Sequence, residues 1–301
     1  MKDAPVLHAV EYAAYRAAKG VLRAAPHAAV RRLGAALGEA AWQLDRRHRR
    51  IALDNLALAL PELDAGERRR IARRCFRHFG AAICDSVSAV RFDLVEMCRR
   101  VTLEGWDHVL EARRRAAPHG IFAMTAHLGL WEMGAHAFGA YAGPLHVVGR
   151  PLDNPRLDRE LVEQRRRFGN ELLPKRGAAR GMIRGIQAGK NVALLIDQRV
   201  QPHEGIEVPF FGRPAWTTPV LARLSLHLGA PVLPIYSLPR PGGRYHVRVE
   251  PPIVPPELPR SAPDAERDAT VRVLTARYLA DMEREIRQRP ELWLWMHRRW
   301  R

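Results

Sequence analysis

The sequence contains little cysteine and no long apolar run. Its 301 residues include three cysteines and no Cys-x-x-Cys pair. Neither a disulfide framework nor a zinc site is therefore expected, and a reduced cytosolic setting is the simpler interpretation. A membrane-spanning helix needs roughly 18 or more uncharged apolar residues, and we find neither such a run nor a signal peptide. These absences argue against a secreted disulfide-rich protein and against an evident membrane-spanning one.

Two common motifs of enzymes are also missing. The sequence has no Gly-x-Ser-x-Gly elbow, which disfavours a hydrolase that uses a serine nucleophile. The pair Gly189-Lys190 has Arg184 where a P-loop requires glycine, and Asn191 follows it. Use of ATP through a P-loop is therefore unsupported.

Acidic residues are scarce relative to basic ones. The chain has 49 Lys and Arg against 32 Asp and Glu, a formal net charge of +17. Such a charge attracts an anionic membrane surface, acidic proteins, phosphorylated substrates or nucleic acid. No recognised nucleic-acid motif accompanies the charge, so we do not expect nucleic acid as a partner.

Residues 120–132 combine a predicted strand with a histidine and a carboxylate. The apolar run Ile121–Thr125 is typical of a short buried strand, and residues 128–138 are predicted to form a helix. His127 lies where the strand ends, and Glu132 lies near the start of the helix. Open α/β sheets bind their ligands at the carboxyl ends of their strands.

The side chains of His127 and Glu132 have complementary chemistry. An imidazole can accept a proton from a hydroxyl near neutral pH. A carboxylate that accepts a hydrogen bond from the other ring nitrogen selects the tautomer and stabilises the imidazolium. The pair is therefore a candidate general base with its orienting partner. The alternative is a histidine that only caps the helix.

Polar residues follow two further predicted strands at what should be the same edge. Arg150 follows one of them, and its planar guanidinium could hold a phosphate or a carboxylate, although it could also be an ordinary surface arginine. Asp197 and Gln198 follow a buried apolar run and are predicted to face a cleft. The alternative for Asp197 is a helix cap.

Two aromatic segments have alternative interpretations. Residues 208–218 contain Phe211, Gly212 and Arg213 before a predicted helix that begins at Thr217. This long loop could line an apolar channel or fold as a lid over the core. At the end of the chain, tryptophans alternate with arginines over residues 293–301. They could anchor at a membrane interface, or the tail could close the core.

The order of the predicted elements indicates the fold class. Residues 1–45 form an amphipathic helical region, apolar on one side and cationic on the other, which suits either a membrane interface or packing on the domain. From about residue 100, strand-like and helical runs alternate. This pattern predicts an α/β fold with a mainly parallel sheet and helices on both faces. We therefore divide the chain into a helical, membrane-associating region, 1–99, and an α/β domain, 100–301.

The chain resembles a known family, the late acyltransferases of lipid A biosynthesis (lauroyl/myristoyl transferases), which belong to the lysophospholipid acyltransferase superfamily. Four motifs in order carry the resemblance: His127-x4-Glu132, Arg150-Pro151, Asp197-Gln198 and Pro209-Phe-Phe-Gly212-Arg213-Pro. It extends to Arg50-Ile-Ala-Leu-Asp-Asn-Leu near the start and to Pro290-Glu-Leu-Trp-Leu-Trp at the end. A set of ordered motifs is far more specific than any one of them.

The resemblance implies an enzyme that moves a fatty acyl chain from an acyl thioester to a hydroxyl of a lipid A precursor. The donor would be acyl carrier protein or acyl-CoA, the acceptor a glycolipid, and the place the cytoplasmic face of the bacterial inner membrane. No metal or other cofactor would be needed. His127 would be the general base and Glu132 its orienting partner. The residues expected to bind substrate are Arg150, Asp197, Gln198, Phe211, Gly212 and Arg213.

Two departures from the family pattern accompany the resemblance. Family members often begin with a membrane-spanning helix, whereas here that segment is weak, so attachment could be peripheral. They also often have asparagine before the histidine of the first motif, where this chain has Ala126.

The motifs do not identify the acceptor. A lysophospholipid, an ornithine-type lipid or another glycolipid is the alternative.

Overall fold

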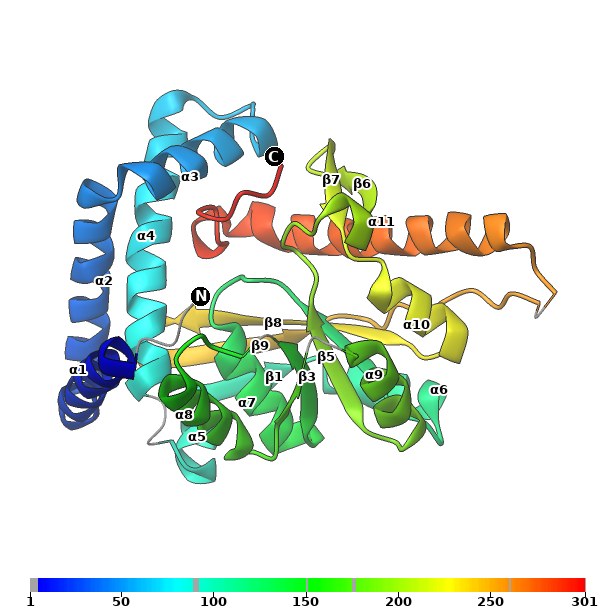
Figure 1. Cartoon of the computed structure of the whole chain (residues 1–301), viewed down its shortest axis with the longest axis horizontal. Helices are drawn as coiled ribbons and strands as arrows, with labels where there is room; N and C mark the ends of the chain where they lie inside the picture. Colours follow the sequence, from blue (N-terminus) through cyan, green and yellow to red (C-terminus); the bar gives the residue numbers. More distant parts are fainter. Residues whose placement is uncertain (1–4, 89–91, 150, 175–176, 260, 301) are drawn as a thin grey trace.

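The structure is a computed structural model that describes residues 5–88, 92–149, 151–174, 177–259 and 261–300 (Figure 1). In this described part of the chain, five helices precede the first strand: α1 (Pro5–Ala24), α2 (His27–Leu44), α3 (Arg46–Ala59), α4 (Ala65–Ser88) and α5 (Leu94–Arg100). The elements that follow are β1 (Val101–Glu104), α6 (Trp106–Ala116), β2 (Phe122–Thr125), α7 (Trp131–Ala142), β3 (Leu145–Gly149), α8 (Pro155–Arg166), β4 (Glu171–Pro174), α9 (Ala178–Gln187), β5 (Asn191–Leu195), β6 (Ile206–Phe210), β7 (Arg213–Thr217), α10 (Val220–Leu228), β8 (Val232–Arg240), β9 (Arg244–Val249) and α11 (Asp264–Gln288).

Seven of the strands form one sheet in the order β1-β9-β8-β2-β5-β3-β4. Neighbours in it run parallel, apart from β8 and β9, which are antiparallel and joined by a short turn. Parallel strands need crossover connections, and helices supply them. The predicted fold class, a mainly parallel α/β sheet after a helical region, is confirmed.

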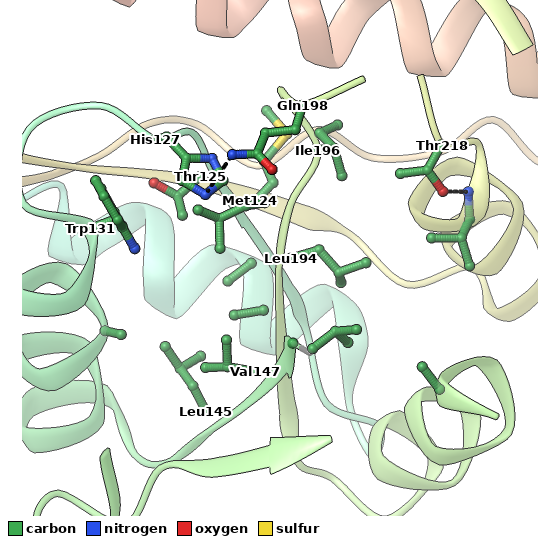
Figure 2. Close-up of a pocket in the computed structure, with 18 of the residues that line it drawn as sticks. Met124, Thr125, His127, Trp131, Leu145, Val147, Leu194, Ile196, Gln198 and Thr218 are labelled. Carbon is green, nitrogen blue, oxygen red and sulfur yellow. Dashed lines mark hydrogen bonds between the residues drawn. The ribbon is translucent and has the colours of Figure 1, made fainter. Parts of the chain in front are cut away.

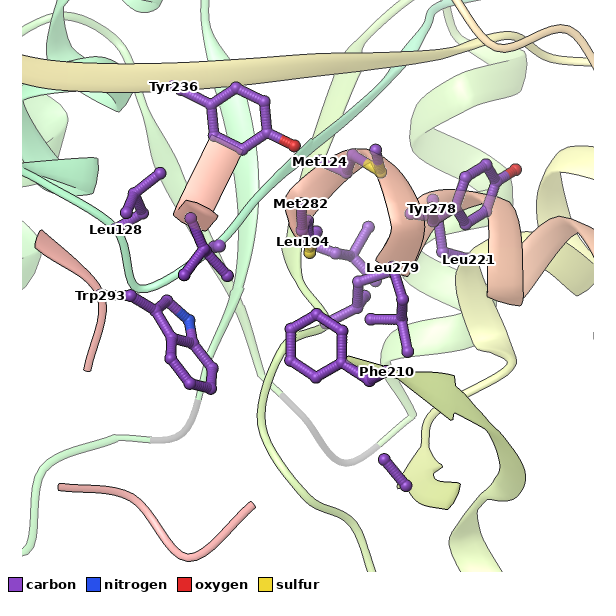
Figure 3. Packing of buried hydrophobic residues seen from close by; sticks show 14 of the residues in the cluster. Met124, Leu128, Leu194, Phe210, Leu221, Tyr236, Tyr278, Leu279, Met282 and Trp293 are labelled. Atoms are coloured by element: carbon purple, nitrogen blue, oxygen red, sulfur yellow. The ribbon is translucent and has the colours of Figure 1, made fainter. Parts of the chain in front are cut away.

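The sheet buries both of its faces. Successive side chains of a strand alternate between the faces. In β2, Phe122 and Met124 join one hydrophobic cluster, whereas Ala123 joins another. The first cluster lies under α9, α10 and α11, and Figure 3 shows Met124 and Leu194 of the sheet near Met282 of α11. The second cluster lies under α6 and α7. With both faces covered by helices, polar chemistry is confined to the edges of the sheet.

Glycines bring α2 and α4 into close contact. A β-carbon added at Gly38 would lie 2.1 Å from the carbonyl oxygen of Phe76, and one at Gly80 would lie 2.2 Å from that of Gly34. Larger side chains would therefore push the helices apart. Trp42 of α2 and Phe76 of α4 belong to the same hydrophobic cluster as β2 and β5. The N-terminal helices thus share a core with the sheet.

The helix α1 keeps much of its predicted apolar face in solvent. Val6, Val10 and Val21 are 77%, 61% and 65% exposed, so these residues do not pack on the domain, although Leu22 is buried. Across the described residues, we find no helix with the length and apolar character to span a bilayer.

The segment expected to be a long loop contains a β-hairpin. β6 and β7 pair antiparallel, and Phe210 lies opposite Arg213 at their closed end. The two turn residues, Phe211 and Gly212, have φ of +53° and +67°. Tight hairpin turns require such positive values, which glycine adopts without strain. Because proline and aromatic residues alternate in this segment, the sequence does not show the usual pattern of a hairpin.

Candidate active site

His127 and Asp197 meet because β2 and β5 are neighbouring strands. The two strands are parallel, and Thr125 lies opposite Leu195 where both end. His127 and Asp197 each follow their strand by two residues, so they arrive level with one another at the carboxyl edge of the sheet.

Asp197 holds the imidazole of His127 in one orientation. Its Oδ1 lies 2.9 Å from Nδ1 of the ring. Its Oδ2 accepts the backbone N–H of His127 at 2.8 Å and the indole N–H of Trp293 at 2.8 Å. Because a carboxylate can only accept, Nδ1 carries the proton and Nε2 keeps its lone pair. The side-chain Nε2 of Gln198 lies 3.3 Å from that lone pair, as a donor would.

The charges around His127 shift its pKa. Burial alone would lower the pKa of His127. The charge of Asp197, the hydrogen bond to it and the charge of Glu132 outweigh burial and raise the pKa above its ordinary value of 6.5. Burial would raise the pKa of Asp197, but the pairing with His127 and the hydrogen bond from Trp293 lower it. The pair thus has the electrostatics of a base with an ionised partner.

Glu132 does not take the expected place beside the ring. Its carboxylate accepts two hydrogen bonds from Arg165 of α8, from Nε at 3.1 Å and from Nη2 at 2.5 Å. The prediction that Glu132 orients His127 through the ring nitrogen is therefore corrected, because Asp197 occupies Nδ1. Glu132 lies in the first turn of α7 and is paired across to α8, whereas Asp197 lies level with His127 on the adjacent strand. Only the charge of Glu132 acts on the ring.

A cavity of about 730 Å³ opens at this edge of the sheet (Figure 2). His127 and Gln198 lie side by side at one end, and Leu145 and Val147 lie toward the other. Glu132 and Arg165 also line it. Most of the remaining wall is hydrocarbon, including Met124, Leu161, Met182, Leu194, Ile196 and Val220. Its volume is typical of a ligand pocket, and its walls suit an alkyl chain.

The other predicted site residues are placed as follows. Gln198 lines the cavity, as expected for a residue that faces a cleft. Arg150 lies outside the described residues. Phe211, Gly212 and Arg213 are not among the described residues that line the cavity. Phe211 instead packs edge-on against the ring of Trp300 in the tail, and its backbone N–H donates to Glu283 Oε2 of α11 at 2.7 Å.

The hairpin lies away from the cavity because its aromatic side chains are buried elsewhere. Phe210 and Phe211 are 1% and 5% exposed and contact Trp293 and Trp300. Of the two alternatives for this segment, a cover over the core matches this placement. A substrate-binding role for Phe211, Gly212 and Arg213 stays a prediction that the position of the cavity does not support.

The C-terminal tail closes the core, which is one of the two alternatives that the sequence left open for it. Trp293 and Trp295 are 1% and 0% exposed, so they close the core and do not reach a membrane. The tail also pairs with the loop that carries the histidine: the backbone N–H of Leu294 donates to the carbonyl of His127 at 3.1 Å, and that of Gly129 donates to the carbonyl of Leu292 at 2.9 Å. The tail therefore braces both His127 and Asp197.

The arrangement can perform base catalysis beside a hydrocarbon chain. A neutral imidazole directs its free nitrogen toward the cavity, an amide donor adjoins it, and apolar walls exclude water. These features suit removal of a proton from a hydroxyl that attacks an acyl carbon. Within the residues that the structure describes, no three His, Cys, Asp or Glu side chains gather in a way that could hold a metal ion.

Comparison with known proteins gives one family. A family model described as bacterial lipid A biosynthesis acyltransferase matches residues 2–301. The lipid A biosynthesis lauroyltransferase of Escherichia coli K12 is 28% identical over 281 residues, which cover 92% of this chain and 86% of that protein. The lipid A biosynthesis palmitoleoyltransferase of the same organism is 28% identical over 275 residues, 89% of this chain and 84% of that protein.

Among solved structures, the 1-acyl-sn-glycerophosphate acyltransferase PlsC of Thermotoga maritima is similar over 78% of this chain and 96% of its own, with 12% identity and a TM-score of 0.35. That similarity is too low to carry an argument about the site. The family model, by contrast, matches almost every residue of the chain. The resemblance indicated by the ordered motifs is therefore confirmed. This protein is an acyltransferase that belongs to the bacterial lipid A biosynthesis acyltransferase family.

Proposed function

We propose that this enzyme transfers a fatty acyl chain from an acyl thioester to a hydroxyl of a lipid A precursor, with His127 as the general base and Asp197 as its positioning residue. One observation carries the proposal. The imidazole, with Nδ1 held by a buried carboxylate, directs Nε2 into a cavity whose walls are mainly hydrocarbon. The +17 charge suits an acidic carrier protein as donor and a phosphorylated glycolipid as acceptor. Coenzyme A is the alternative donor.

The proposed reaction needs no covalent enzyme intermediate. The acceptor hydroxyl gives its proton to His127 Nε2 while its oxygen attacks the thioester carbon. The tetrahedral intermediate then collapses, the carbon–sulfur bond breaks, and the new ester bond remains. The thiolate that leaves takes the proton back from the imidazolium, so the imidazole is neutral again. Asp197 stays ionised throughout and stabilises the imidazolium.

Gln198 is the described residue best placed to stabilise the oxyanion. Its amide nitrogen lies 3.3 Å from His127 Nε2, and the residue lines the cavity. When a hydroxyl takes the place beside Nε2, this amide can donate to the oxygen that gains charge on the thioester carbon. Glu132 and Arg165, paired with one another, line the same cavity, and the guanidinium could also bind an anionic group of either substrate.

The exposed apolar face of α1 supports a membrane role for residues 1–99, with residues 100–301 carrying the chemistry. Val6, Val10 and Val21 would lie at the interface, next to cationic residues that favour anionic lipid. The enzyme would then attach peripherally to the cytoplasmic face of the inner membrane. Flotation with anionic vesicles should show binding that falls when the exposed Val6, Val10 and Val21 are replaced with aspartate. Unchanged flotation would contradict this role.

The transfer itself can be tested directly. Purified protein, an acyl carrier protein thioester and a lipid A precursor should give an acceptor whose mass rises by one acyl group. The His127→Ala variant should lose about a hundredfold or more of this rate, the usual effect of removing a general base. A parallel assay with a lysophospholipid in place of the precursor distinguishes between the two candidate acceptors. Transfer to that lipid alone would contradict the lipid A assignment, and a folded His127→Ala protein of wild-type rate would contradict the base.

The pH profile should report the raised pKa of His127. Only the neutral imidazole accepts a proton, so kcat/KM should rise with pH, with its inflection above the ordinary 6.5. In Glu132→Gln the inflection should move to lower pH, because a charge that raises the pKa of His127 is lost while the amide oxygen still accepts from Arg165. Glu163→Gln, on the exposed side of α8, is the matched control. An inflection at or below 6.5 in the wild-type enzyme would contradict the electrostatics.

A further inference from the structure

A second apolar groove, of about 300 Å³, lies between α4 and α8 with α1 at its end (Figure 1). Phe79, Ile83 and Val87 line it from α4, at positions four residues apart, so they share one face of that helix. Leu157 and Leu161 line it from α8 with the same spacing. Two helices thus direct apolar stripes at a common gap.

The groove and the larger cavity meet beside the catalytic histidine. Trp131 and Glu132 line both, as do Leu152 and Leu161. The ring of Trp131 lies 5.0 Å from that of His127 and 6.1 Å from that of Phe79, centre to centre. Trp131 therefore lies between His127 and Phe79 and belongs to the walls of both hydrocarbon-lined spaces.

Hydrogen bonds fix the spacing of the helices that form the groove. Gln164 of α8 donates to the carbonyl of Ser86 of α4 at 2.8 Å. Tyr12 of α1 donates to Glu160 of α8 at 3.1 Å. Between these contacts the apolar lining reaches solvent, since Ile83 is 65% exposed. Burial of a hydrocarbon chain there would remove apolar surface from water, so the groove is suited to a chain.

We infer that this groove binds a hydrocarbon chain of the acceptor lipid, while the larger cavity takes the acyl chain of the donor; the inference rests on the proposed function. Transfer between two lipids requires two chains to approach one base without competing for the same space. The cavity, which His127 lines, and the groove share Trp131 in their walls, and the ring of Trp131 contacts that of His127. The acceptor would lie across the open side of the groove, with its hydroxyl directed past Trp131.

Filling the groove tests the inference. Ile83→Trp on α4 and Leu157→Trp on α8 place bulk in it from opposite walls. Each should raise KM for the lipid A precursor about tenfold, which corresponds to about 1.4 kcal/mol of binding, and leave KM for the acyl carrier protein thioester unchanged. Val273→Trp, an exposed residue of α11, is the matched control and should alter neither constant.

A synthetic precursor with truncated fatty chains sharpens the test. With that acceptor, wild type, Ile83→Trp and Leu157→Trp should share one KM, because no chain remains to fill the groove. Unchanged KM for the full-length precursor in both variants, or a rise in KM for the donor, would overturn the inference while the proposed function stands. Failure of the wild-type enzyme to acylate the precursor would refute the proposed function, and the inference with it.

Discussion

Replacing Asp197 with asparagine should lower kcat by about a hundredfold or more, the same scale as loss of the base, because the orienting carboxylate of a histidine base becomes an amide. The amide can present its NH2 group to Nδ1, and this favours the tautomer with the proton on Nε2. In that tautomer the nitrogen that faces the cavity has no lone pair with which to accept. Rapid-quench kinetics at saturating thioester and acceptor measures the effect on the transfer step itself.

The relative losses of kcat distinguish the roles of the two carboxylates near the imidazole ring. Glu132→Gln should reduce kcat far less than Asp197→Asn, since Glu132 acts on His127 only through its charge. A larger loss for Glu132→Gln would contradict the pairing described above. Asp281→Asn is the matched control, because Asp281 is also a buried carboxylate and accepts from Tyr236 at 2.7 Å, outside the described cavity lining. Its folded variant should keep the wild-type kcat.

Trp293→Ala should lower the free energy of unfolding by about 3–5 kcal/mol, the usual cost of removing a buried tryptophan side chain. The indole is 1% exposed and contacts Phe210, Phe211 and Trp295. Its loss would leave a void and remove a donor from Asp197. Urea denaturation followed by circular dichroism measures the change.

A second variant separates packing from the hydrogen bond. Trp293→Phe keeps an aromatic ring but lacks the N–H, so it should lose less stability and still reduce kcat by about tenfold, the scale of one hydrogen bond to a charged group. Trp106→Ala is the control, because that tryptophan is 38% exposed and its loss should cost little. Equal stabilities for Trp293→Ala and Trp106→Ala would show that the tail does not brace the core.

The candidate site was partly predictable, and the reason lies in the distances along the chain. His127 could be found because its strand, its turn and its helix are contiguous. Asp197 and Gln198 could be expected at the same edge, because a buried strand precedes them. Their partnership with His127 could not, since the sequence does not state that β2 and β5 are neighbours. Glu132, five residues from His127, was the nearer candidate in sequence and the wrong one for the hydrogen bond.

The tail is a second case in which the sequence left two alternatives open and the structure decided between them. Alternating tryptophan and arginine is compatible with a membrane interface and with a core-closing segment, because both present apolar rings beside cationic groups. In the structure Arg299 is buried and donates to the carbonyl of Trp216 and the hydroxyl of Thr217. These acceptors for its two Nη atoms offset part of the cost of burying the guanidinium, and Nε has no partner among the described residues. Composition alone does not reveal acceptors supplied by a distant hairpin.

By itself, the sequence determined the α/β class, the helical region that precedes it, the family and the histidine at the end of a strand, because periodicity, turn residues and ordered motifs are local properties. Tertiary structure alone decided which carboxylate meets the imidazole, which tryptophan supports that carboxylate, and where two hydrocarbon-lined spaces join. These depend on strand order and helix packing, which bring together residues 70 to 165 positions apart through contacts that no local pattern encodes.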